Sequence, residues 1–546
     1  MELAKKSLLT WTFLVQIGLL FFTASAVCGQ ILPSGTEIQV AASATYQAAP
    51  AVTSDAGGNV FTAVWQKQAG GAWDIYARQY TASGGPLVPG AEFRVNTQTA
   101  GCQQLPSVAA DLAGNFVVVW QSDQDPGGGS GIYARRFNSA GGALDATEFR
   151  VNTTTVGNQA RPSVAVAPDG RFLVAWQSDQ QSGGQGWDIA AQAYNVSGTL
   201  AGGEVLANSG TNGAQTSPRA AYLSAPTAGF AVAWEGTGAI FVRRLGITGA
   251  AIDAADRQVN STSTGFQRSP ALASDPSGNY AVAWESWDVN GATSRILARR
   301  FQGVSPLNST DLTIDPSAAA TQQRNPAVAS DTLGNWVVSW DSLDEDPSGA
   351  GLVVQQIDNR QIPAGSKIVL NNTITAGDQS LPGVTLTQGS RMLAVWQSFT
   401  SAADSAVIEA RSGNLAGGSF FTFQPCRLLD TRGAAGPLGG PALSPGVPRV
   451  FPVVSSSACG IPSTAKALSV NVTAVNAPGI GSINLYPGDG PSVTTVVVNF
   501  SSSRSTIADN AHVLLSRDGL GTIAALASIP GGGQVHLIID VNGYYQ

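Results

Sequence analysis

Charged side chains are scarce in this sequence, and histidine and methionine are nearly absent. Asp, Glu, Lys and Arg together make up 12% of the 546 residues, and the chain has two methionines, two histidines and a net charge of −7. So little charge argues against long, surface-charged helices, and the acidic balance argues against nucleic acid as a partner. The 63 glycines indicate a turn-rich β protein. The length predicts several cores or one large repeat array.

The first residues have the three parts of a secretory signal peptide. Lys5 and Lys6 precede an apolar run, Leu8 to Phe22, which leads into Ala24-Ser25-Ala26. We therefore expect a signal peptide over residues 1–26 and a secreted, extracellular or cell-surface protein. A permanent membrane anchor is the alternative for this run. The residues before Cys28 do not fit a lipoprotein site, and no later apolar run is long enough to predict a transmembrane segment.

Seven prolines recur at intervals of 56 residues, with one interval of 52. They are Pro50, Pro106, Pro162, Pro218, Pro270, Pro326 and Pro382. A glutamine stands three residues before each: Gln47, Gln103, Gln159, Gln215, Gln267, Gln323 and Gln379. Such regularity is typical of a tandem repeat with one supersecondary unit per period.

Each repeat unit predicts four short strands. The proline is followed by a strand, a turn and an apolar run that ends in tryptophan, such as Phe116 to Trp120. These runs do not alternate apolar with polar residues, so both faces of the strand must be buried, as in a propeller blade. Ile132 to Phe137 and Glu148 to Asn152 are examples of the third and fourth strands.

The seventh unit lacks a fourth strand at its C-terminal end. A matching segment, Glu37 to Val40, precedes the first unit instead. Pairing of that segment with the last unit would close the ring and leave no open edge. The sequence thus predicts an all-β protein in which residues 36–411 form a seven-bladed β-propeller completed by the N-terminal strand.

The repeat pattern reads Gln-x-x-Pro, then Gly-Asn-aromatic-Val-Val-x-Trp, then Ile-Tyr-Ala-x-Arg-Phe. It resembles a repeat found in many large secreted bacterial proteins, and the resemblance covers about residues 36–411. It implies a binding or scaffolding propeller and supplies no catalytic residues.

A second domain is predicted after a Gly-rich linker at residues 412–419. Pro425 to Arg432, Cys459 to Pro462 and Ile539 to Tyr545 resemble the motifs of a domain common at the ends of exported proteins of environmental bacteria. The resemblance implies a surface or wall-associated module without catalytic residues. Alternating stretches such as Gln534 to Val541 favour a β-sandwich over residues 420–546.

Two cysteines, Cys426 and Cys459, lie in this second domain. An exported protein can form a disulfide between these two cysteines, and such a bond would stabilise the domain by about 3 kcal/mol. Two separate buried thiols are the alternative.

Candidate chemistry is sparse. The two histidines, His512 and His536, lack metal-ligand spacing and are expected to be structural. We also expect the seven glutamines to be structural, because their amides can satisfy backbone groups in buried turns between blades. The alternative is a ring of amides that binds a ligand at the mouth of a channel.

Acidic loops between the second and third strands are the candidate ligand-binding residues. They contain Asp123, Asp125, Asp179, Asp288, Asp344 and Asp346. Four of them, Asp123, Asp125, Asp344 and Asp346, form the candidate Ca²⁺ site, and solvated hairpin turns are the alternative. No other cofactor is expected. Strand order predicts that these loops share one rim with the Gln-x-x-Pro turns.

The residues favour a secreted or cell-surface binding or adhesion protein, without enzymatic activity, whose propeller presents a face to an extracellular glycan, polymer or protein. The alternatives are a secreted propeller-type hydrolase acting on carbohydrate and a structural envelope protein. An enzyme would show a concave pocket with two or more convergent acids.

Overall fold

The computed structural model describes most of the chain after the predicted signal peptide. The described residues are 31–545 except 42–44, 56–59, 82–90, 126–127, 180–185, 211–212, 225–226, 317–321, 332–333, 347–348, 358–362, 372–376, 388–389, 400–405, 416–419, 455–458, 463–464, 466, 490–496, 502–505 and 517–519. The predicted signal peptide and Cys28 lie outside this part. Within it every regular element is a strand, which confirms the all-β prediction.

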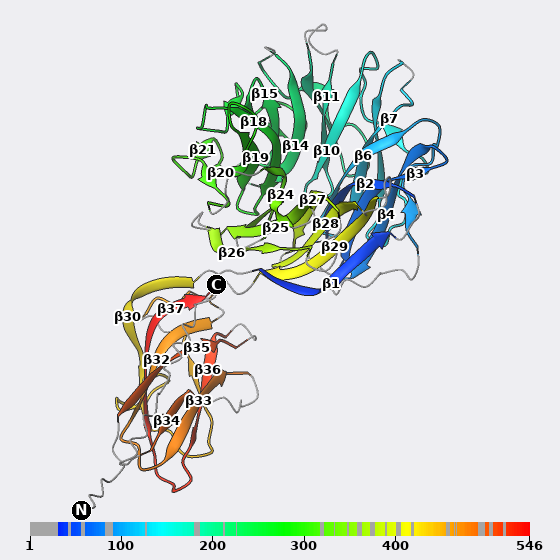
Figure 1. Ribbon diagram of the computed structural model, residues 1–546. Coiled ribbons are helices and arrows are strands. Elements are labelled where there is room, and N and C mark those ends of the chain that lie inside the picture. The colour runs from blue at the N-terminus through cyan, green and yellow to red at the C-terminus, as the bar shows by residue number, and fades with distance from the viewer. Residues whose placement is uncertain are drawn as a thin grey trace, which may run out of the picture.

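Seven small antiparallel sheets follow one another around a ring (Figure 1). Their first strands are β2 (Gln47–Ser54), β6 (Gln103–Ala110), β10 (Gln159–Val166), β14 (Gln215–Leu223), β18 (Phe266–Ser274), β23 (Gln323–Ser330) and β27 (Gln379–Leu386). Each first strand contacts the next, and β27 contacts β2, so the series closes on itself.

The second and third strands complete the body of each sheet. The second strands are β3 (Val60–Ala69), β7 (Phe116–Ser122), β11 (Phe172–Ser178), β15 (Gly229–Gly236), β19 (Asn279–Trp287), β24 (Trp336–Asp346) and β28 (Arg391–Phe399). The third strands are β4 (Ala72–Thr81), β8 (Gly131–Phe137), β12 (Asp188–Tyr194), β16 (Ala239–Gly246), β20 (Ser294–Gln302), β25 (Gly349–Ile357) and β29 (Ala406–Leu415).

The fourth strands are mostly short. They are β5 (Phe93–Arg94), β9 (Phe149–Arg150), β13 (Val205–Leu206), β17 (Arg257–Gln258), β22 (Leu312–Thr313), β26 (Pro363–Val369) and, for the last sheet, β1 (Ile31–Ala41). One further short strand, β21 (Ser305–Pro306), pairs with β20.

Burial on both faces of the second strands holds neighbouring sheets together. Val64 of the first sheet packs in one cluster with Val118 and Trp120 of the second, while Val117 and Val119 face the third. The tryptophan that ends each apolar run is fully buried in all seven sheets. The absence of alternation in the sequence therefore corresponds to burial between two neighbouring sheets, as predicted.

Strand β1 closes the ring beside β29, where the two ends of the repeat array meet (Figure 1). Its register pairs Ile38 with Ala410 and Gln39 with Glu409. Both strands are longer than the sequence suggested. Residues 412–415 of the predicted linker belong to β29, and residues 416–419 lie outside the described part.

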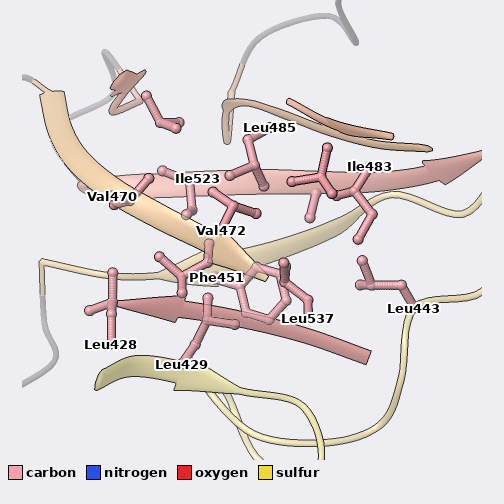
Figure 2. Close-up of a cluster of buried hydrophobic side chains, with 14 of the residues drawn as sticks. Leu428, Leu429, Leu443, Phe451, Val470, Val472, Ile483, Leu485, Ile523 and Leu537 are labelled. Carbon is pink, nitrogen blue, oxygen red and sulfur yellow. The ribbon is translucent and has the colours of Figure 1, made fainter. Parts of the chain in front are cut away.

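The chain after residue 420 forms two four-stranded sheets around one apolar core. One sheet contains β30 (Phe420–Asp430), β37 (His536–Tyr545), β32 (Ala467–Val475) and β35 (Ile507–Leu514). The other contains β31 (Arg449–Pro452), β36 (Thr522–Ser528), β33 (Gly481–Pro487) and β34 (Val498–Phe500). Figure 2 shows side chains of both sheets meeting in this core, among them Val472 of β32 and Ile483 of β33.

The predicted disulfide between Cys426 and Cys459 is present and packs against this core. Such a bond is typical of proteins that fold in an oxidising compartment. The described residues contain no helix long and apolar enough to cross a membrane.

Candidate functional site

The seven repeat glutamines have structural contacts at the start of each first strand. All are buried, and in five sheets the glutamine Oε1 accepts a hydrogen bond from the indole N–H of the tryptophan that ends the second strand. In the sixth sheet Gln323 Oε1 accepts instead from the backbone N–H of Ile296. These contacts give six buried glutamines the hydrogen-bond partners that buried polar groups need. A structural role for all seven stays a prediction.

The residue before each proline has a left-handed backbone conformation, with φ between 50° and 55°. These residues are Ala49, Leu105, Arg161, Ser217, Ser269, Asn325 and Leu381. In each sheet the register between the first and second strands shifts at this point. Non-glycine residues adopt this conformation at a cost, and such strain is often found at functional sites.

All seven of these residues line one cavity of about 370 Å³, which we call the central cavity. Its wall is built from the first strands of all seven sheets, and each strand contributes its left-handed residue. The repeat proline also lines the cavity in every sheet except the fourth and fifth. The bulge at the start of every first strand thus places one side chain per sheet at a shared opening.

An acceptor side chain from the preceding sheet supports most of these bulges. It is the residue directly after the buried tryptophan. Gln66 Oε1 accepts from the N–H of Leu105 at 2.8 Å, and Gln177 Oε1 accepts from the N–H of Ser217 at 3.1 Å. The position is glutamine in four sheets: Gln66, Gln121, Gln177 and Gln397.

Three consecutive sheets replace this glutamine with a carboxylate: Glu235 in β15, Glu285 in β19 and Asp341 in β24. Glu235 Oε2 accepts from the N–H of Ser269 at 3.2 Å, and Glu285 Oε1 accepts from the N–H of Asn325 at 2.8 Å. Both donors line the central cavity. The second oxygen of Glu285 accepts from the indole N–H of Trp287 at 2.8 Å.

The three carboxylates interact through their charges. Burial raises the pKa of Glu235, and the charge of Glu285 raises it further. Burial also raises the pKa of Asp341 to about 6, against the opposing effects of the Asn325 amide, which donates to Oδ1 at 2.8 Å, and of Arg324. The negative charge of Glu285 adds to this rise as well, so Glu285 acts on the pKa of both other carboxyl groups.

Glu235 differs from its neighbours in being accessible. Glu285 and Asp341 are buried, whereas Glu235 is half-buried. A carboxyl group that is partly accessible and has a raised pKa is suited to donate a proton.

Arginines accompany the carboxylates in the same part of the ring. Arg268 and Arg161 both lower the pKa of Glu235, which opposes the effect of burial. Arg324 Nε lies 3.4 Å from Asp341 Oδ2. Arg161 and Arg219 line the central cavity itself. Two arginines therefore line the cavity itself, whereas Glu235 and Glu285 hold the backbone of its lining residues Ser269 and Asn325.

The register confirms that the acidic loops share a rim with the Gln-x-x-Pro turns. Gln103, at the start of β6, pairs with Ser122, at the end of β7. The candidate residue Asp123 follows directly, and its Oδ2 accepts from the N–H of Cys102 at 3.3 Å. Asp179 makes the equivalent contact with the N–H of Asn158 at 2.8 Å.

The other candidate loop acids are also bound locally. Asp125 and Asp346 are buried and accept from the amides of Asn152 and Asn371 at 3.0 Å and 2.9 Å. Asp288 accepts from the N–H groups of residues 290 and 292 in its own turn. The side chain of Asp344 lies outside the described part. The described residues contain no group of three or more candidate metal ligands, and the Ca²⁺ site stays a prediction.

The sequence contains a signal for the three carboxylates, which is the residue type directly after each repeat tryptophan. When the units are aligned on their tryptophans, the next residue is Gln, Gln, Gln, Glu, Glu, Asp and Gln in turn. The acidic loops were more conspicuous because their acids are clustered in the sequence, whereas these three acids are 50 or more residues apart and converge only through the ring.

Comparison with known proteins gives distant structural likenesses. No family model matches the chain, and neither does any curated protein. A protein of unknown function from Dyadobacter fermentans shares 10% identity over 70% of this chain and 99% of its own, with a TM-score of 0.43. A polysaccharide lyase of the ulvan lyase family PL25 shares 10% over 69% and 95%, with a TM-score of 0.43. An exo-β-1,3-galactanase from Phanerochaete chrysosporium shares 13% over 80% and 95%, with a TM-score of 0.31.

These comparisons contradict the expectation of a binding or adhesion protein without enzymatic activity. The neighbours whose names give an activity are enzymes that act on carbohydrate: a galactanase, an ulvan lyase and an arabinofuranosidase. The sequence favoured a protein without enzymatic activity because its acids are scattered along the chain. The likeness is too distant to assign residues, so any site must rest on the side chains of this chain.

Proposed function

We propose that this protein is an exported enzyme that cleaves glycosidic bonds of an extracellular polysaccharide, with its active site in the central cavity beside Ser269 and Asn325, the lining residues that Glu235 and Glu285 support. The observation that carries the proposal is the replacement of glutamine by a carboxylate in three consecutive sheets. Structure alone does not require this replacement, because glutamine fills the same supporting position in the other four sheets. Convergent acids beside a concave cavity are a feature of catalytic sites.

Cleavage of a glycosidic bond needs a proton for the departing oxygen and a second group that activates or stabilises the reacting centre. Glu235 is suited to the first role because it is half-buried, has a raised pKa and contacts the cavity-lining Ser269. Burial is the main cause of that raised pKa, and the negative charge of Glu285 adds to it. Asp341 is a second carboxyl group with a raised pKa, held in place by Asn325.

The proposed architecture is a seven-bladed β-propeller followed by a β-sandwich. Seven sheets in a closed series, a terminal strand that completes the last sheet, and two facing four-stranded sheets around one core support it. Export is supported by the disulfide and by the sequence of residues 1–26. The proposed relation to repeats and end domains of exported bacterial proteins rests on the sequence motifs.

The test is a screen of the purified protein against neutral and acidic polysaccharides. New reducing ends would report hydrolysis, and absorbance of an unsaturated sugar would report elimination. Glu235→Gln is the informative variant, because the equivalent positions of four other sheets already carry glutamine. Gln121→Ala, at the equivalent position of the second sheet, is the matched control.

We expect Glu235→Gln to lower the cleavage rate by about 100-fold or more while the melting temperature stays near that of the unmodified protein. Gln121→Ala should keep most of the activity. Full activity in Glu235→Gln, or equal losses in both variants, would contradict the proposed site. The absence of cleavage of every polysaccharide in both assays would contradict the proposed function.

A further inference from the structure

The position directly after the repeat proline is small in six of the seven sheets. The residues are Ala51, Ser107, Ser163, Ala271, Ala327 and Gly383. All of them line the central cavity, which they keep open because little side-chain volume enters it. The fourth sheet departs from this rule, since the position is Arg219 in β14.

A second arginine lies beside it in the neighbouring sheet. Arg161, the left-handed residue of β10, lines the same cavity, and β10 contacts β14. Both side chains are exposed to the cavity. Enclosure by the surrounding protein, together with the positive charge of Arg161, lowers the pKa of Arg219 to about 10. Arg219 therefore remains charged at neutral pH. We call Arg161 and Arg219 the arginine pair.

Neither arginine of the pair forms a salt bridge with a carboxylate among the described residues. Arg324 of the sixth sheet, which does not line the cavity, lies against Asp341, whereas Arg219 donates to the carbonyl oxygen of Pro218 at 2.9 Å and forms no ion pair with any described residue. Two like charges in an enclosed space repel each other, and an anion between them would relieve this repulsion.

Guanidinium groups bind planar carboxylates and tetrahedral sulfates through paired hydrogen bonds. Ser217, Ser269 and Asn325, which line the same cavity, add hydroxyl and amide groups of the kind that bind sugar hydroxyls. A chain of sugars that carries anionic groups matches both features.

We infer that the arginine pair binds an anionic group of the substrate, and that the substrate is an acidic polysaccharide bearing uronate carboxylates or sulfate esters. That the bound polysaccharide is a substrate rests on the proposed function. The anion site itself does not depend on catalysis. Binding at the pair would place the neighbouring sugar in the cavity that Ser269 also lines, and the N–H of Ser269 donates to Glu235.

The test is equilibrium binding by calorimetry with the full chain, which needs no turnover. The probes are a short oligomer of galacturonic acid, a sulfated oligosaccharide and a neutral oligosaccharide of similar length, with inorganic sulfate as a fourth probe. The variants take their residues from other sheets: Arg219→Ala copies Ala271, and Arg161→Ser copies Ser269, which has the same positive φ. Arg171→Ala, at the turn between β10 and β11, is a matched loss of charge.

We expect the unmodified protein and Arg171→Ala to bind at least one anionic oligosaccharide, and binding to weaken with added salt. The double variant Arg161→Ser/Arg219→Ala should bind it about tenfold or more weakly, which corresponds to the loss of one strong charge-assisted contact. The uronate and sulfated probes distinguish the two sources of the anionic group, and inorganic sulfate alone would identify a site for free anion.

Equal affinity of the double variant and the unmodified protein for the anionic probes would overturn the inference. So would preference of the unmodified protein for the neutral oligosaccharide. Glu235→Gln should bind the anionic probe as tightly as the unmodified protein. If it binds but neither protein cleaves any polysaccharide, the proposed function fails while the anion site stands.

Discussion

Replacement of Glu409 by glutamine should stabilise the ring at alkaline pH. Glu409 lies on β29, opposite Trp396 of β28 and Gln39 of the closing strand β1. In the other six sheets the residue opposite the equivalent tryptophan is apolar or aromatic. These residues are Tyr76, Tyr133, Ala190, Phe241, Leu297 and Val353. A carboxylate therefore occupies a core position in the seventh sheet.

The size of the effect follows from the pKa of Glu409. Burial, together with the negative charge of Glu37, raises this pKa from 4.5 to about 7. The side chain is 2% exposed, and its Oε2 has no hydrogen-bond partner among the described residues. Below pH 4.5 the group is neutral in both the folded and the unfolded chain. As the pH rises through 7, the folded chain must accept a buried charge, and it loses about 3 kcal/mol of stability.

The assay is urea unfolding followed by tryptophan fluorescence at pH 5 and pH 8. No tryptophan lies between residues 420 and 546, so the signal reports the ring alone. Glu409→Gln should raise the free energy of unfolding by up to about 3 kcal/mol at pH 8 and by much less at pH 5. Glu37→Gln, which removes only the neighbouring charge, should give a smaller gain. Equal effects of Glu409→Gln at both pH values would refute a buried, ionisable Glu409.

Further predictions concern the ring, the disulfide and the loops. Trp120→Ala should cost about 3–5 kcal/mol, because this fully buried side chain contacts two sheets, and a near-neutral result in urea unfolding would contradict double-faced burial. Deletion of residues 37–42 should expose β29 and cause aggregation or broadened unfolding, whereas melting like the full chain would contradict closure by β1. Replacement of both Cys426 and Cys459 by alanine should lower the stability of the second domain by about 3 kcal/mol, measured by calorimetry against reduced and oxidised protein. Asp123, Asp125, Asp344 and Asp346 changed together to asparagine should abolish any calcium-dependent rise in melting temperature, while Asn115→Ser and Asn279→Ser at the opposite rim should not, and an unchanged calcium response would remove the Ca²⁺ site.

Much of the fold could be predicted because the seven repeat units can be aligned with one another within this single sequence. The spacing of the prolines, the buried tryptophans and the non-alternating runs such as Phe116 to Trp120 each correspond to a feature of every sheet. The closing strand was predictable from Glu37 to Val40 because its offset matched that of later units. The disulfide was predictable because two cysteines lie in the second domain.

The candidate site could not be predicted in the same way, because it is made by contacts between units. Glu235 supports Ser269 of the next sheet, and Glu285 supports Asn325, so each acid acts on the first strand of the following unit. The pKa of Asp341 depends on burial and on Glu285, neither of which a local motif reveals. Alignment of the units on their tryptophans would have marked these positions as exceptions, but not their convergence.

A crystal structure of the protein with a bound oligosaccharide tests the central claim most directly, with Glu235→Gln used to preserve the ligand. The account predicts density for the sugar chain in the central cavity, with a glycosidic oxygen within hydrogen-bond distance of residue 235 and an anionic group on Arg161 and Arg219. Sugar bound only on the outer faces of the sheets or on the second domain, with the central cavity empty, would contradict it.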